Sequence, residues 1–183
     1  MKNILILFTL GVLFASCADK ETQIKTGNLA DTKNINKVEL EYVDKWNQIE
    51  FAQTDDKYGE WGGDTEIILV YSDGKKYYAN YAKHLGSQEP LIAPIENKEI
   101  KKWYEYKKLD FKIDSVKLDQ NKIALVENAI LGLVKQKIQN PSYISHSGIY
   151  NSVITRDSSL VIDDFPSGKW LDFQKLKNSL TKK

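Results

Sequence analysis

The chain contains a single cysteine, Cys17, and this one count constrains how its fold can be stabilised. No disulfide can form within the chain, so the fold has to rest on a buried hydrophobic core. The chain has 183 residues, of which 42% are hydrophobic and 28% are charged. A domain of this size can bury a sufficient core without cross-links, and the composition is that of an ordinary globular protein.

The first 16 residues have the three-part organisation of a secretory leader. Lys2 gives a positive start, an apolar stretch follows over residues 4–14, and Ala15 and Ser16 are small residues suited to a peptidase. The apolar stretch is too short to cross a bilayer as a helix, which takes about 20 residues. The polar segment that follows it argues against a buried core helix. The start of the chain therefore predicts export.

The residues around the cysteine indicate the kind of leader. The run Leu13-Phe14-Ala15-Ser16-Cys17 resembles the signal peptide and lipobox of bacterial lipoproteins. The resemblance implies that residues 1–16 are removed and that Cys17 carries lipid, with palmitate among its acyl chains. It also implies an outer-membrane location in the cell envelope, facing either the periplasm or the cell surface. Several acyl chains give lasting attachment, whereas a single chain binds a membrane only marginally.

Behind the leader, the chain divides into a tether and a domain. Residues 18–35 are polar and lack an apolar face. We therefore expect residues 17–35 to be a lipidated cysteine and a flexible tether, which spans about 25 Å. Residues 36–183 are the predicted single domain. Removal of the leader takes away Lys2 and leaves 25 basic against 25 acidic side chains. This balance argues against nucleic acid as a partner, since nucleic-acid sites are strongly basic.

Apolar patterns predict three strands in the first part of the domain. We expect half-buried strands over residues 38–42 and 46–53, because apolar and polar side chains alternate there. Ile49 and Phe51 would face the core. A continuous apolar run predicts a central strand over residues 66–71.

Two hairpins are predicted from turn residues. Asp73 and Gly74 favour a tight turn, after which the chain returns as a strand over residues 75–81. Short apolar runs over residues 151–155 and 160–162 predict a second hairpin further along the chain.

Helical spacing and caps predict two main helices. Asp119 is suited to cap a helix over residues 120–138, and Ser167 a helix over residues 169–180. Residues 96–106 favour an additional short helix. The order of strands, helix, strands and helix lacks the regular alternation of a parallel sheet. It predicts an α+β domain, with an antiparallel sheet and two main helices packed on one face.

Neither a metal site nor a cofactor is predicted. The chain has two histidines, His84 and His146, whereas a zinc site normally takes three or four ligands. The acidic loop over residues 55–64 could hold calcium, but its spacing does not match an EF-hand, and we favour a solvated loop. Arg156 is the only arginine, which argues against a dedicated nucleotide site. The chain also lacks a glycine-rich phosphate-binding motif.

The case for catalysis rests on a few side chains. Ser145 and Ser147 flank His146, and Asp163 and Asp164 could orient it or act as an acid and base pair. Sequence neighbours rarely form a catalytic pair, because the base has to reach the nucleophile in space. The two aspartates more simply mark the end of a strand. A cell-wall or glycan hydrolase is therefore only a third hypothesis.

The aromatic residues are more informative. Tyr58 and Trp61 lie in the acidic, glycine-rich loop rather than on a periodic apolar face. Exposed tryptophan and tyrosine are typical of interface hot spots and of platforms for sugar rings, so we predict that these two residues bind a partner. The alternative is that Trp61 folds back as a lid on the core. Trp103 and Trp170 have helically spaced apolar partners and are predicted to be core residues.

These observations favour a non-enzymatic, protein-binding lipoprotein. It would be anchored in the membrane through the lipid on Cys17 and would bind another protein of the envelope. An immunity or inhibitor protein is one concrete version of this hypothesis. The alternative is an accessory subunit of an envelope transport or secretion complex.

Overall fold

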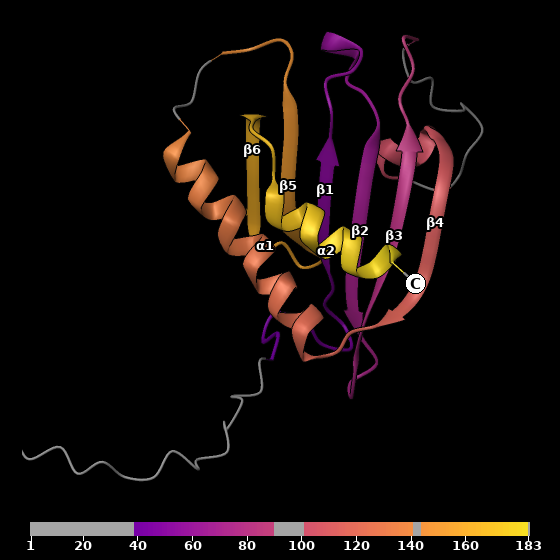
Figure 1. The fold of residues 1–183 in the computed structure, drawn as a ribbon, viewed down its shortest axis with the longest axis vertical. Helices are drawn as coiled ribbons and strands as arrows, with labels where there is room; N and C mark the ends of the chain where they lie inside the picture. The colour runs from indigo at the N-terminus through magenta and orange to yellow at the C-terminus, as the bar shows by residue number, and fades with distance from the viewer. Residues whose placement is uncertain (1–38, 90–100, 141–143, 183) are drawn as a thin grey trace, which may run out of the picture. The chain divides into compact units, whose positions relative to one another are not determined.

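The described part of the chain folds as a six-stranded antiparallel sheet with two α-helices on one of its faces (Figure 1). The computed structural model describes residues 39–89, 101–140 and 144–182, which all belong to the compact unit Asn36–Lys183. The predictions for the leader, for Cys17 and for the tether lie outside the described residues. The predicted α+β class is confirmed, and so is the antiparallel sheet with helices on one face.

The sheet has the strand order β4-β3-β2-β1-β5-β6, so the first strand along the chain lies near its middle. Both predicted hairpins are present, as β2–β3 and β5–β6. The strands are β1 (Ile49–Thr54), β2 (Thr65–Ser72), β3 (Tyr77–Leu85), β4 (Lys108–Lys117), β5 (Ile149–Thr155) and β6 (Val161–Ser167).

The strand predicted over residues 38–42 is wrong for residues 39–42, which form irregular chain and a turn. Val38 lies outside the described residues. The Val43 N–H donates to the Leu40 carbonyl at 2.9 Å, and both side chains are buried in the core. The alternation of apolar residues indicates which side chains are buried, but it does not require a strand. Here a turn places the apolar side chains against the core.

β1 pairs with β2 on one side and with β5 on the other. The predicted inward orientation of Ile49 and Phe51 is confirmed, since both side chains are fully buried. Because side chains alternate across a strand, Glu50, Ala52 and Thr54 point to the opposite face of the sheet. This second face carries the candidate site.

The β2–β3 hairpin has a longer connection than predicted. Ser72 pairs with Tyr77, so residues 73–76 form the loop and β3 begins two residues later than expected. The Asp73 carboxylate accepts two backbone N–H groups of this loop, both at 2.8 Å. Gly74 has a φ of 90°, which favours glycine.

The predicted long helix is present as α1 (Gln120–Gln139). Asp119 caps it as predicted, because its carboxylate accepts the Lys122 N–H at 2.9 Å. The helix lays one apolar face on the sheet, and its buried residues are Ile123, Val126, Ala129, Ile130 and Leu133.

The last helix is α2 (Leu171–Thr181), with Phe173, Leu176 and Leu180 buried. The prediction that Ser167 caps it is wrong, since Ser167 belongs to β6 and donates its hydroxyl to Asp164. The helix instead starts after Trp170, whose indole N–H donates to the Ala129 carbonyl of α1 at 3.0 Å. The helices are thereby joined to each other as well as to the sheet.

β4 is an edge strand that was not among the predicted elements. Most of its side chains are exposed, and two register irregularities interrupt its pairing with β3. Such bulges and charges are common on edge strands, where they discourage further pairing. The short helix predicted over residues 96–106 is present only as the single 3₁₀ turn η2 (Trp103–Tyr106), and residues 96–100 lie outside the described residues.

Candidate functional site

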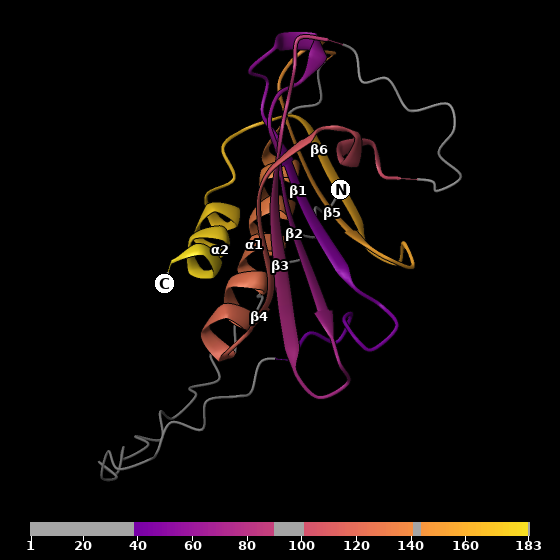
Figure 2. The same cartoon turned by 90° about the vertical axis from the view of Figure 1, so that its right-hand side faces the viewer.

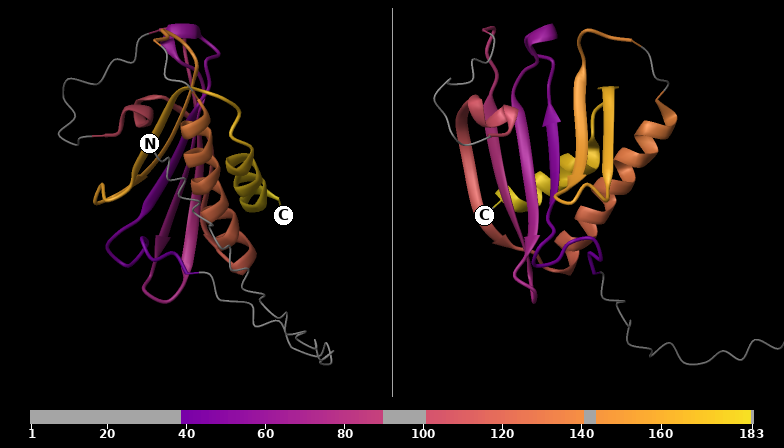
Figure 3. Two further views of the ribbon diagram at one scale, coloured as in Figure 1. Left: turned by 90° about the vertical axis from the view of Figure 1, so that its left-hand side faces the viewer. Right: turned by 180° about the vertical axis from the view of Figure 1, so that it is seen from behind.

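The chain segment that leads into β4 lies on the sheet face opposite the helices. We call residues 101–107, which include η2, the strap, and we call this side of the sheet the strap face. Figures 2 and 3 show both helices on one side of the sheet and the strap on the other. The Tyr104 ring is buried together with Ala52 of β1 and Ile67 of β2. The strap therefore gives the strap face a small core of its own.

Glu50 of β1 anchors the strap to the sheet. The Tyr104 hydroxyl donates to Glu50 Oε2 at 2.7 Å, and the Lys102 ammonium binds the same oxygen. Burial, followed by the hydrogen bond to Glu50, raises the pKa of Tyr104, so its hydroxyl remains a donor at neutral pH. The charge of Glu50 is matched locally by Lys102.

Lys107, at the end of the strap, is buried, with 8% of its surface exposed. Its ammonium donates to the Gly63 carbonyl at 2.7 Å and to Thr65 Oγ1 at 2.9 Å, and it lies 4.6 Å from the centre of the Trp103 ring. Burial lowers the pKa of Lys107, although the charges of Asp55 and Asp64 oppose this shift. Lys107 therefore connects the loop after β1 to the strap and to Trp103.

That loop, residues 55–64, is held by its own carboxylates, and we call it the aromatic loop. Asp55 Oδ1 accepts the Asp64 N–H at 2.9 Å, and Asp64 in turn accepts the Gly86 N–H at 3.1 Å and pairs with Lys83 at 3.2 Å. Burial alone would raise the pKa of Asp64, but the bonds from Gly86 and Lys83 outweigh it and hold the pKa below its usual range. These acidic side chains stabilise the loop.

The side chains of Trp61 and Trp103 are both exposed. Trp61 ends the 3₁₀ turn η1 (Gly59–Trp61) and is 53% exposed, which excludes the alternative that it covers the core. Trp103 is 46% exposed, so its prediction as a core residue is wrong: the short turn η2 buries the neighbouring Tyr104 instead. Trp170 is a core residue as predicted, with 1% exposed.

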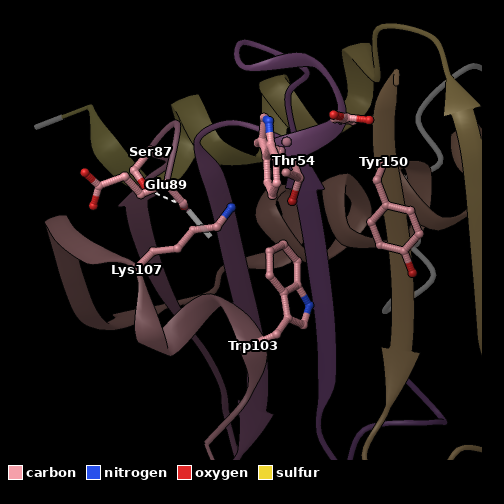
Figure 4. A pocket seen from close by; sticks show the side chains of 9 residues that line it. Thr54, Ser87, Glu89, Trp103, Lys107 and Tyr150 are labelled. Atoms are coloured by element: carbon pink, nitrogen blue, oxygen red, sulfur yellow. Dashed lines mark hydrogen bonds between the residues drawn. The ribbon is translucent and has the colours of Figure 1, made fainter. Parts of the chain in front are cut away.

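Trp61 and Trp103 line one cavity of about 400 Å³, which we call the Trp61 cavity. Figure 4 shows Trp103 and Lys107 entering from the strap and Tyr150 from β5. Three separate segments thus bring aromatic rings to one place. The remaining lining residues are Thr54, Glu60, Gly62, Ser87 and Glu89.

Trp103 also lines a second cavity of about 470 Å³, which we call the Arg156 cavity. Arg156 comes from the turn between β5 and β6, and Lys102 and Tyr104 come from the strap. The Arg156 backbone N–H donates to the Gln48 carbonyl at 2.8 Å, which fixes the base of this turn. The Trp103 side chain therefore stands between two hollows of the strap face.

Sequence reasoning found part of this site. Trp61 lines the Trp61 cavity, whereas Tyr58 is half-buried and does not, and its ring lies 5.1 Å from the Lys57 ammonium. The partner-binding role of both residues stays a prediction. Trp103 and Tyr150 were missed, because nothing local in the sequence shows that they line the same cavity. The only available signal was the high content of tyrosine and tryptophan.

The structure does not assemble the catalytic set considered from sequence. His146 lies on an exposed bend, and in the described residues no hydrogen bond or ion pair joins it to Asp163 or Asp164. The prediction that the two aspartates end a strand is wrong, since both lie within β6. Asp164 is buried and accepts hydrogen bonds from Asn140 and Ser167, so it stabilises the fold.

Among residues 39–89, 101–140 and 144–182, no group of three or more potential metal ligands is placed to hold an ion. His84 is buried in β3 beside Tyr104, with ring centres 5.5 Å apart, and its Nδ1 has no hydrogen-bond partner among the described residues. Neither α1 nor α2 has the length and apolar character of a membrane-spanning helix.

A scan against protein-family models finds no matching family, and searches of curated proteins and of solved structures find no match.

Proposed function

We propose that this chain is a membrane-anchored, non-enzymatic binding module that holds another protein of the bacterial envelope against its strap face. An immunity or inhibitor protein is the concrete form of this proposal. One observation carries it: Trp61, Trp103 and Tyr150 come from three separate segments and line one cavity on the sheet face opposite the helices.

The physical argument starts from the exposed tryptophans. A large apolar ring held at the surface exposes area that a partner can bury, and tryptophan and tyrosine dominate the energetics of protein interfaces. Lys107 holds Trp103 from one side, and the neighbouring Tyr104 is fixed by Glu50. Such a ring loses little conformational freedom on binding, which favours affinity.

The anchor follows from the resemblance of the leader to a lipoprotein signal peptide. Lipid on Cys17 would hold the chain at the membrane, and residues 18–35 would let the domain reach a partner within about 25 Å. We expect Cys17→Ser to leave the membrane fraction and to lose incorporation of a labelled fatty acid. Unchanged membrane attachment of that variant would contradict lipid anchoring.

The binding proposal is tested by quantitative affinity capture. The full chain, tagged at its C-terminus, is captured from detergent-solubilised envelope, and the bound proteins are measured by mass spectrometry. We expect one stoichiometric partner, whose recovery falls more than about tenfold with Trp103→Ala, the loss typical of a hot-spot tryptophan. The identity of the partner would separate an inhibitor from a subunit of an envelope machine.

Trp46→Ala is the matched control, because Trp46 is 75% exposed and does not line either cavity. We expect it to capture the partner as the parent chain does. Circular dichroism and thermal melting check that each variant is folded. Equal recovery by the Trp103→Ala chain and the Trp46→Ala chain would remove the strap face from the proposal.

A further inference from the structure

The two cavities beside Trp103 differ in the charge that they offer a ligand. In the Trp61 cavity, the carboxylates of Glu60 and Glu89 make no ion pair within the described residues. Lys107 lines the same cavity, and its buried ammonium donates to two neutral acceptors, the Gly63 carbonyl and the Thr65 hydroxyl. The nearby carboxylates of Asp55 and Asp64 offset its charge, so the excess charge at this cavity is negative.

The unmatched charge of the Arg156 cavity is positive. Glu50 is neutralised there by Lys102 and also accepts the Tyr104 hydroxyl. The Arg156 guanidinium has no acceptor within the described residues. Arginine presents a planar set of donors that matches a carboxylate with two parallel hydrogen bonds.

The turn that carries Arg156 is well fixed, which makes its position usable for recognition. Asp157 accepts the N–H and the hydroxyl of Ser159, at 3.0 Å and 2.7 Å. Asn47 accepts the Asp157 N–H at 3.2 Å, so the turn is also joined to the chain before β1. A fixed turn presents the single arginine of the chain at one point of the strap face.

We propose that the two cavities form one groove for an extended peptide segment of the protein partner. A basic side chain of the segment faces Glu60 and Glu89, an acidic side chain faces Arg156, and an apolar side chain crosses Trp103. This inference rests on the proposed function and specifies the partner's chemistry. Opposite charges at the two ends select a peptide over a neutral glycan, which offers hydroxyl groups but no charges.

Synthetic peptides test the charge pattern directly. Each has a central phenylalanine, with Lys at one end and Glu at the other in either order, or with Lys at both ends, or with Glu at both. One, two or three alanines stand between the phenylalanine and each charged end, so that the series covers several distances between the two charges. The readout is the indole N–H resonances of the ¹⁵N-labelled full chain in detergent, assigned with Trp→Phe variants.

We expect the mixed-charge peptides to shift the Trp61 and Trp103 resonances and to leave those of Trp46 and Trp170 unchanged. The best mixed-charge peptide should bind about tenfold more tightly than either like-charged peptide, since like-charge contacts are strongly unfavourable. High salt should reduce this difference.

Charge reversal provides the sharper test. Arg156→Glu should shift the preference to the peptide with two lysines, and the double change Glu60→Lys with Glu89→Lys should shift it to the peptide with two glutamates. Lys135→Glu is the control, because Lys135 is exposed on α1, which packs on the opposite sheet face. It should leave the preference of the parent chain unchanged.

The possible failures are distinguishable. Equal binding of all peptides, or no shift with any of them at millimolar concentration, would overturn the charged groove. Stronger shifts of the same resonances by N-acetylglucosamine oligomers would overturn the peptide class. In each case, the proposed function still stands if Trp103→Ala lowers the recovery of the protein partner. If Trp103→Ala leaves that recovery unchanged, the proposed function itself is overturned.

Discussion

At the scale of single residues, aspartates that accept backbone N–H groups define several turns. Asp73, Asp119 and Asp157 each bond to an N–H two or three residues ahead. This arrangement is local, because a short carboxylate reaches only nearby donors. Such roles can be predicted from sequence, as the cap at Asp119 was. Lys107 shows the opposite case, because nothing in its sequence neighbourhood separates this buried lysine from the exposed ones.

The turn beside Arg156 predicts a pH effect. Hydrogen bonds from the N–H and then the hydroxyl of Ser159 lower the pKa of Asp157 to about 2. Because the folded-state pKa is below the unfolded value of 3.8, Asp157 stabilises the fold above pH 3.8. This stabilisation is lost as the pH falls through the folded-state value. A carboxyl-carbon NMR titration should therefore place the midpoint of Asp157 near 2.

Asp157→Asn keeps an acceptor in this turn but cannot titrate. Its free energy of unfolding should therefore fall less steeply between pH 4 and pH 2 than that of the parent chain. Asp56→Asn, at a side chain without a hydrogen bond in the described residues, should follow the parent chain. A parallel fall for the Asp157→Asn and parent chains would contradict this role for the carboxylate.

At the scale of elements, the predictions succeeded where a local pattern and its boundary signals agree. α1 has both an apolar stripe and a cap. The β2–β3 hairpin has an apolar run, a turn and a returning strand. β4 was not predicted, although charged and apolar residues alternate over residues 108–113 as they do in a half-buried strand. The burial that this pattern indicates is small in the structure, because Leu109 and Phe111 stay about half exposed. In the structure it is held by pairing with β3 and by side chains, since the Phe111 ring lies 6.0 Å from Tyr81 and Asn80 accepts the Ser115 N–H at 2.8 Å.

The cap of α1 predicts a measurable cost. Asp119→Ala removes the acceptor of the Lys122 N–H and should lower the free energy of unfolding by about 1 kcal/mol in denaturant titrations. Asp114→Ala removes only an exposed pair with Lys112 and should change stability by less than about 0.5 kcal/mol. Equal losses of unfolding free energy in the two variants would contradict a stabilising role for Asp119 as the cap of α1.

The position of the aromatic loop depends on two glycines. A Cβ on Gly86 would lie 2.4 Å from the Gly63 carbonyl oxygen, so Gly86→Ala should push the loop away from β3. We expect a loss of about 1–3 kcal/mol in the free energy of unfolding and a shifted Trp61 indole resonance. Gly168→Ala is the control, since its Cβ would meet only the flexible Gln136 amide. An unmoved Trp61 resonance in Gly86→Ala would argue against this packing.

At the scale of the whole molecule, one aromatic cluster joins the sheet to both helices. The Trp170 ring lies 5.0 Å from Phe173 of α2 and 6.1 Å from Phe51 of β1, between ring centres. Its indole N–H also bonds to α1. Trp170 therefore connects three elements that are distant in sequence, and the core depends on it.

Trp170→Phe keeps a ring but loses the bond to Ala129 and part of the filled volume. The free energy of unfolding should fall by about 1–3 kcal/mol, measured by denaturant titration. Trp46→Phe should leave stability almost unchanged, because Trp46 is 75% exposed. A loss in Trp46→Phe as large as in Trp170→Phe would contradict the central place of Trp170.

The sequence by itself determined the α+β class, both hairpins, α1 with its cap, and the inward faces of β1 and α2. Each depends on the spacing of neighbouring residues, which the backbone geometry of helices and strands converts into faces. The tertiary structure alone decided the strand order, the burial of Lys107, the exposure of Trp103 and the cavity that Trp61, Trp103 and Tyr150 line together. These features join segments far apart in sequence, and their positions follow from how the strap packs across the sheet.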